Sequence, residues 1–198
     1  VLVEPRAVVG VPVNDSAHDA NPALGPALLA LAACAVALLS GPVAALAYTP
    51  LEPVLRATGL TLQHLRPIHE TFAFAWVVLG GVAVATAWLR AAGGPFTPSQ
   101  QLRLTAQNLL WSAAGAGILV TLLAGRFIGR EYAGFHPAFA AMILAGWLLF
   151  AWNFFQRARV SPRSPAWILM WAAAIPLFAL SQLESHAWLL DAVSGRPV

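Results

Sequence analysis

Lysine is absent from this chain of 198 residues, cysteine occurs once, and only 10% of the residues carry a charge. An ordinary soluble domain carries roughly 25% charged residues, so this composition cannot cover a water-facing surface. The one cysteine, Cys34, has no second thiol to pair with, which excludes a disulfide framework or a thiolate metal site within the chain. We expect it to pack as a small apolar residue.

The positive charges are all arginines, and with 8 acidic residues the 11 arginines give a net charge of +3. They stand singly or in a group of three between apolar runs. Proteins that bind nucleic acid gather their positive charge in a patch or stripe. The sequence therefore predicts no nucleic-acid partner.

Hydrophobic residues make up 59% of the chain, and several apolar runs continue for more than twenty residues. Strands of a membrane barrel alternate polar and apolar residues, which these runs do not. Only helices and closed barrels satisfy every backbone polar group in lipid. The sequence therefore predicts an all-α transmembrane helix bundle of about five spans, with the lipid bilayer as its surroundings.

A helix of roughly 20 residues crosses a hydrocarbon core of about 30 Å. We place a polar N-terminal segment at 1–23, a bundle at 24–190 and a tail at 191–198. Because the chain begins with valine and its first stretch is unlike a signal peptide, we expect a trimmed start or a piece of a longer protein. The expected spans are 24–48, 67–92, 102–125, 136–156 and 165–190.

Proline positions sharpen these spans. Pro67, Pro137 and Pro165 each stand in the first turn of an expected helix, where the missing N–H costs nothing. Pro176 falls within the fifth span and predicts a kink there. The mildly amphipathic link at 49–66 is too long for a tight turn, and we expect it along the membrane surface.

Orientation follows from the arginines between spans four and five. Arg157, Arg159 and Arg163 gather in one short loop, and such loops face the cytoplasm in most membrane proteins. Because this loop and the N-terminus lie on the same side when the chain crosses five times, the cluster predicts a cytoplasmic N-terminus.

With five crossings, the start of span two, the link between spans three and four and the end of span five share one membrane face. Polar groups at the ends of apolar helices are costly unless they are paired, hydrated or ligating, so their gathering suggests a site. This face collects His64, Arg66, His69, Glu70, Arg126, Arg130, Glu131, Glu184 and His186.

His69 is the sharpest candidate among them. It lies in the run LRPIHETFAFAWVVLGG, about one turn inside the second span. An imidazole at that position can ligate an iron centre in a low-dielectric pocket. The plainer reading is an interfacial hydrogen-bonding residue.

This run resembles the second membrane helix of the catalytic subunit of the haem-copper oxidase superfamily, in the branch of the nitric oxide reductase large subunit and the C-type cytochrome oxidases. There an Arg-x-x-His signature precedes an aromatic, glycine-bearing helix, as Arg66 and His69 do here. The resemblance implies that His69 is an axial ligand of a low-spin haem b and that Arg66 neighbours the propionates. It also implies that the chain is a multi-pass protein of the cell inner membrane.

A second similarity follows in the same order. The run GREYAGFHPAFAAMILAGWLLFAWNFF is similar to the Gly-Arg-Glu-Tyr/Phe segment between the third and fourth helices of these subunits. The resemblance implies that Glu131 helps to hold a calcium ion beside the propionates and that Arg130 is a further cofactor-binding residue. Calcium prefers carboxylate and carbonyl oxygens, which agrees with this role. The stretch WILMWAAAIPLFALSQLESHAWLL resembles the fifth helix of some members, without a ligand role for Glu184 or His186.

The resemblance reaches only the first part of the family's subunit. After His69 the chain offers only His136 and His186, neither in a motif like those of the remaining metal ligands. The dinuclear centre that reduces oxygen or nitric oxide is therefore not in this chain, which cannot be the complete enzyme. The implied partners are the remaining helices or a second membrane chain, and a cytochrome c-type subunit or quinol as electron donor.

Two other functions stay open at this point. The chain can be a self-contained b-type cytochrome in which His69 and His186 ligate one haem. Alternatively, it can be a non-catalytic scaffold or assembly subunit whose histidines are structural.

Overall fold

The computed structural model describes residues 21–127, 135–158 and 164–185, and within these ranges every regular element is a helix. Two short elements, a 3₁₀ turn at Leu46–Tyr48 and helix α2 at Glu52–Ala57, join the first two long helices. The five long helices are α1 (Leu24–Ala45), α3 (Leu62–Gly93), α4 (Pro98–Leu123), α5 (Pro137–Ala158) and α6 (Ala166–Ser185).

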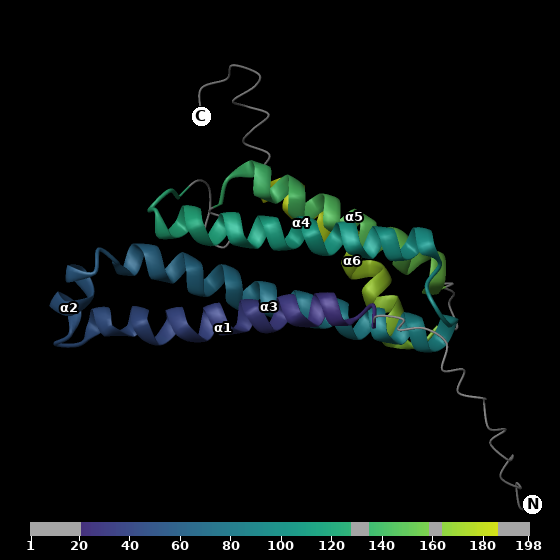
Figure 1. The fold of residues 1–198 in the computed structure, drawn as a ribbon, viewed down its shortest axis with the longest axis horizontal. Helices are drawn as coiled ribbons and strands as arrows, with labels where there is room; N and C mark the ends of the chain where they lie inside the picture. The colour runs from purple at the N-terminus through teal and green to yellow at the C-terminus, as the bar shows by residue number, and fades with distance from the viewer. Residues whose placement is uncertain (1–20, 128–134, 159–163, 186–198) are drawn as a thin grey trace, which may run out of the picture.

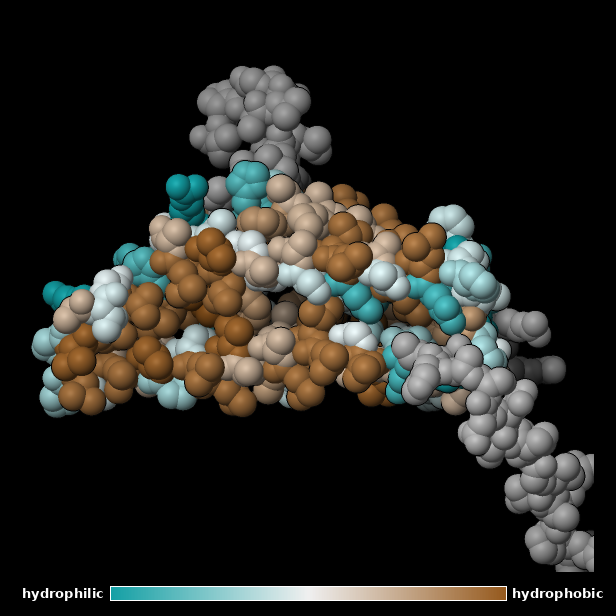
Figure 2. Space-filling view, viewed as in Figure 1, coloured by the Kyte–Doolittle hydropathy of each residue, from teal (hydrophilic) through white to brown (hydrophobic). Residues whose placement is uncertain are grey.

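Each of these five helices is long and apolar enough to cross a bilayer. Their outward faces carry large apolar side chains; Leu38 and Leu39 of α1, for example, are 67% and 72% exposed. Apolar residues cover most of the face in Figure 2, and polar residues lie mainly towards the ends of the helices. The protein is a multi-pass membrane protein of all-α class, as its composition predicts.

The second span begins earlier than predicted. Helix α3 starts at Leu62 rather than at Pro67, which lies inside the helix instead of in its first turn. Thr61 and His64 form a capping box at the start, in which the Thr61 hydroxyl and the Nδ1 atom of His64 are 2.8 Å apart. Because this cap satisfies the first backbone N–H groups, the helix begins five residues before Pro67.

The remaining boundaries lie close to their predicted positions. Pro137 is the first residue of α5, as expected, whereas Pro165 precedes the first residue of α6. Helix α4 begins at Pro98 after a Thr97 cap, four residues before the predicted start. Helix α6 runs continuously through Pro176, and residues 186–190 of the predicted fifth span lie outside the described residues.

The long helices pair in two layers. Helix α1 packs most extensively on α3 and α4 on α5, while α6 crosses the bundle against α5 (Figure 1). Helix α2 lies at the end of the α1–α3 pair, where Leu55 is buried with Ala44 and Leu65. The link at 49–66 thus closes one end of the bundle.

Tryptophan N–H groups in the core bond to backbone oxygens of neighbouring helices. The Nε1 atom of Trp147 donates to the carbonyl oxygen of Ile175 at 2.9 Å. Trp111 donates to the carbonyl oxygen of Ile143 at 3.1 Å. Since lipid offers no hydrogen-bond partner, polar groups at this depth must be satisfied within the protein, and these two bonds tie α4 to α5 and α5 to α6.

Candidate functional site

The side chain of His69 lies against helix α1. It is half-buried in α3, and its Nδ1 atom is 2.8 Å from the carbonyl oxygen of Ala37, a buried residue of α1. A carbonyl oxygen only accepts hydrogen bonds, so Nδ1 carries the proton and donates it. This bond leaves Nε2 as the ring nitrogen that is able to bind a metal.

A glycine in α1 makes this contact possible. A Cβ atom placed on Gly41 would lie 2.8 Å from both Cε1 and Nδ1 of His69. Ordinary carbon contacts need about 3.5 Å or more, so any larger residue at this position would push the ring away. Gly41 and the carbonyl of Ala37 together fix the orientation of the imidazole.

Arg66 is held one turn before His69 on the same helix. Its Nε atom is 2.8 Å from the Oε1 atom of Glu70, an i,i+4 ion pair in which the arginine side chain is 55% exposed and the glutamate 19%. The pair holds the Arg66 guanidinium near the start of α3, one turn before His69. An exposed pair of this kind contributes little to stability, so its position is the informative feature.

The start of α3 and the end of α4 lie at the same end of the bundle. The His64 ring, at the start of α3, and the Phe127 ring, beyond the end of α4, make an edge contact with their centroids 5.6 Å apart. Three residues predicted on the same face, namely Arg130, Glu131 and His186, lie outside the described residues.

The other two histidines in the described part of the chain, His64 and His136, form hydrogen bonds at the starts of helices. The Nδ1 atom of His136 accepts a hydrogen bond from the backbone N–H of Ala138 at 3.2 Å, and His64 belongs to the Thr61 capping box. Within residues 21–127, 135–158 and 164–185, no three His, Cys, Asp or Glu side chains gather as a metal site. His69 is therefore the histidine best placed to bind a metal as one ligand of a larger set.

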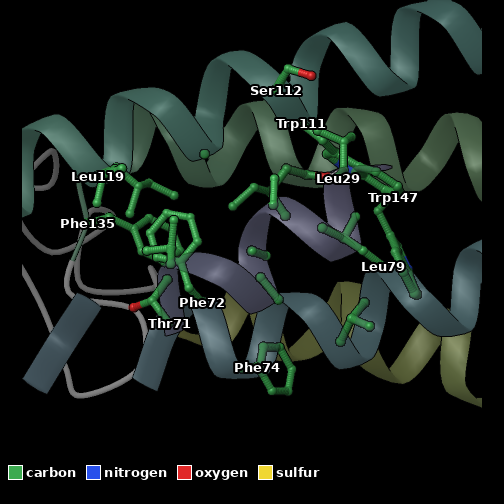
Figure 3. Close-up of a pocket in the computed structure, with 18 of the residues that line it drawn as sticks. Leu29, Thr71, Phe72, Phe74, Leu79, Trp111, Ser112, Leu119, Phe135 and Trp147 are labelled. Carbon is green, nitrogen blue, oxygen red and sulfur yellow. Dashed lines mark hydrogen bonds between the residues drawn. The ribbon is translucent and has the colours of Figure 1, made fainter. Parts of the chain in front are cut away.

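A large apolar cavity lies between the helices. Its volume is about 760 Å³. Trp111, Leu29 and Trp147 gather at one end of it and Phe72, Leu119 and Phe135 at the other (Figure 3). Its walls come from α1, α3, α4, α5 and α6 together with Phe135, and they do not include His69. The ligand face of His69 and the cavity are thus separate features.

The opposite end of the bundle carries a polar cluster that the sequence reading did not identify. The Nε atom of Arg103 donates to the buried Asn153 Oδ1 at 2.8 Å, and its Nη2 atom donates to Gln156 Oε1 at 2.7 Å. Asn153 in turn donates to the carbonyl oxygen of Gln100 at 3.2 Å. The signal was present in α4, where Gln100, Arg103 and Gln107 recur at helical spacing in an apolar run.

Arg157 completes this cluster from α5. Its guanidinium donates to the Gly94 carbonyl oxygen at 2.6 Å and to Gln100 Oε1 at 2.8 Å, and it lies 4.2 Å from the centroid of the Phe96 ring. These bonds satisfy backbone oxygens in the turn between α3 and α4. The cluster therefore joins α3, α4 and α5 at one membrane end and is structural in character.

Fold and site together define a helical multi-pass membrane protein in which a histidine of the second long helix is held in one orientation by the first. No protein-family model, curated protein or solved structure matches the chain.

Proposed function

We propose that the chain is the haem b-binding membrane part of a respiratory reductase, either a nitric oxide reductase or a terminal cytochrome oxidase. The observation that carries the proposal is the bond from His69 Nδ1 to the Ala37 carbonyl oxygen. Histidines that ligate metals almost always donate their other ring N–H to a carbonyl or carboxylate, which fixes the tautomer and the ring plane. The bond from His69 to the Ala37 carbonyl oxygen meets this requirement.

The donor set fits one half of an axial pair. His69 offers Nε2 for haem iron, and Arg66, one turn towards the start of α3, offers a charged donor for propionate groups. Arg130 and Glu131 are assigned by sequence resemblance alone, as a further propionate partner and as a calcium ligand. When bound, haem b supplies one-electron transfer, and its axial ligand, nearby charge and burial set the potential.

The chain's own residues orient and place the group. Gly41 leaves room for the His69 ring, and the Ala37 carbonyl holds it in one plane. The second axial ligand and the dinuclear centre belong to further helices, on the same or another polypeptide. In this proposal the membrane is the inner membrane, the N-terminus is cytoplasmic, and a cytochrome c-type subunit or quinol donates the electrons.

The test isolates the complex from cells that have ample haem, through a tag on this chain, and records its reduced-minus-oxidised absorbance spectrum. We expect the bands of a six-coordinate haem b, lost in His69→Ala and retained in His136→Ala, which removes an exposed histidine from the start of α5. A haem-free complex, or a spectrum unchanged in His69→Ala, would refute the proposal. Equal loss in His186→Ala for the purified chain alone would identify the self-contained cytochrome instead.

A further inference from the structure

Arg90 stands in the last turn of α3, and its guanidinium forms no hydrogen bond or ion pair with another described residue. The two other described arginines at this end of the bundle are engaged. Arg103 bonds to Asn153 and Gln156. Arg157 bonds to carbonyl oxygens of the turn between α3 and α4. Because a guanidinium carries five N–H donors and stays charged, Arg90 is able to bind an anion from outside the bundle.

The Arg90 side chain lines a surface pocket between the start of α1 and the end of α3. The pocket has a volume of about 480 Å³. The Oδ1 atom of Asn21 accepts a bond from the backbone N–H of Ala23 at 3.2 Å, so the amide nitrogen of Asn21 remains as a second donor. The lining consists mainly of small residues, which leave room for a ligand: Asn21, Ala87, Arg90, Ala91, Gly94 and Pro95.

No carboxylate from the described part of the chain balances this positive charge. The described acidic residues are Glu52 in α2, Glu70 near the start of α3 and Glu184 near the end of α6. None of the three lines the pocket. Glu70 precedes Arg90 by twenty residues, which is about 30 Å along α3. The pocket therefore favours an anion that has no cationic group of its own.

Apolar surface continues from the pocket towards the middle of the bilayer. Ala87 lines the pocket, and Val84, Gly80 and Val77 follow it on the same face of α3 at helical spacing. Val84 and Val77 are 70% and 58% exposed, and a Cβ atom on Gly80 would meet nothing within 4 Å.

This strip of α3 has the length of an acyl chain in one leaflet. Thirteen residues separate Arg90 from Val77, which is about 20 Å. One leaflet contributes about 15 Å to a hydrocarbon core of about 30 Å. A ligand with an anionic head and a long apolar tail therefore matches the pocket and the strip together, whereas a free phosphate uses the pocket alone.

We propose that the Arg90 pocket binds the phosphate of an anionic phospholipid, one acyl chain of which lies along the strip from Val84 to Val77. Guanidinium and phosphate groups form paired, charge-assisted hydrogen bonds, which are among the stronger polar contacts in proteins. The Asn21 amide supplies a further donor to the same phosphate. The site lies at the opposite end of α3 from His69 and is independent of haem binding.

The test is native mass spectrometry of the full chain, purified in a neutral detergent and mixed with phosphatidylglycerol or phosphatidylcholine at equal concentration. We expect one phosphatidylglycerol to be retained in preference to phosphatidylcholine. Arg90→Gln should weaken this binding about fivefold, which corresponds to about 1 kcal/mol for one arginine beside anionic lipid. Arg126→Gln is the matched control, because it removes an exposed arginine beyond the end of α4, and it should bind as wild type does.

Two further variants separate the pocket from the charge. Ala87→Leu fills the pocket without changing the charge and should also weaken the binding of phosphatidylglycerol. Arg90→Lys keeps the charge and should retain part of the binding. A Tm close to that of wild type shows that each variant is folded.

Three results would overturn the proposal. The first is equal retention of the two lipids by wild type. The second is binding of phosphatidylglycerol that is unchanged in Arg90→Gln, or that falls equally in Arg126→Gln. The third concerns a free phosphate: phosphatidylglycerol should raise the Tm of wild type more than inorganic phosphate does at the same concentration, and equal shifts would show that the pocket binds phosphate without a lipid.

Discussion

Gly41→Ala adds one methyl group at the point where α1 meets the His69 ring. The new Cβ would lie 2.8 Å from Cε1 and Nδ1 of His69 and 3.6 Å from Cγ. The ring must retreat by about 0.7 Å or more to reach an ordinary contact distance of about 3.5 Å. A displacement of that size takes Nδ1 from 2.8 Å to the limit of hydrogen-bond distance from the Ala37 carbonyl oxygen.

Three contributions decide the size of the effect. Overpacking a filled site costs about 1–3 kcal/mol. The lost hydrogen bond costs about 1 kcal/mol. Alanine improves the helix propensity of α1 by up to about 1 kcal/mol over glycine. We therefore expect a net destabilisation of about 1–3 kcal/mol, together with weaker haem binding because the imidazole is no longer held in one plane.

The assay compares the Tm of the purified protein and the haem content of the tagged complex for wild type and variant. Gly80→Ala is the control, because a Cβ at Gly80 in α3 meets nothing within 4 Å. It should be neutral or slightly stabilising and should leave the haem spectrum unchanged. If Gly41→Ala matched Gly80→Ala in both measurements, the proposed role of α1 in orienting His69 would be wrong.

Three further substitutions test individual contacts. Asn153→Leu removes the buried acceptor of Arg103 Nε and should lower the free energy of unfolding by about 1–3 kcal/mol. The measurement is the Tm. Gln156→Leu removes the exposed acceptor of the same arginine and should not lower the Tm to the same extent. Trp147→Phe keeps most of the aromatic packing but removes the bond to Ile175, so unfolding should require about 1 kcal/mol less free energy; an unchanged stability would show that this bond contributes nothing. His64→Ala removes the α3 capping box and should cost about 1 kcal/mol without loss of haem absorbance; loss of haem would instead assign His64 to the cofactor.

The helical spans could be predicted from the sequence because apolar runs of this length have few other solutions in lipid. The start of α3 could not be predicted in this way. Pro67 indicated a start at that residue, but the capping box of Thr61 and His64 begins the helix at Leu62. His69 was recognisable from its motif. The hydrogen bond from His69 to the Ala37 carbonyl oxygen could not be predicted, because the register of α1 against α3 depends on where a glycine lets the two helices approach closely.

The complete burial of the Gln107 side chain could not be predicted from the sequence for a similar reason. In the sequence, a glutamine at helical spacing from Leu104 and Trp111 is equally compatible with a hydrogen bond to a neighbouring side chain. Only the packed arrangement shows that no such partner is within reach among the described residues.

The turn between α3 and α4 depends on an arginine that the ribosome adds about sixty residues later. Until α5 joins the bundle, the carbonyl oxygens of Gly94 and Pro95 lack the guanidinium that they bond in the finished protein. The connection between α3 and α4 therefore takes these hydrogen bonds from a helix that follows both of them in the sequence. The contact between the second and third crossings of the bilayer is thus completed by the fourth long helix, α5, rather than by their own residues.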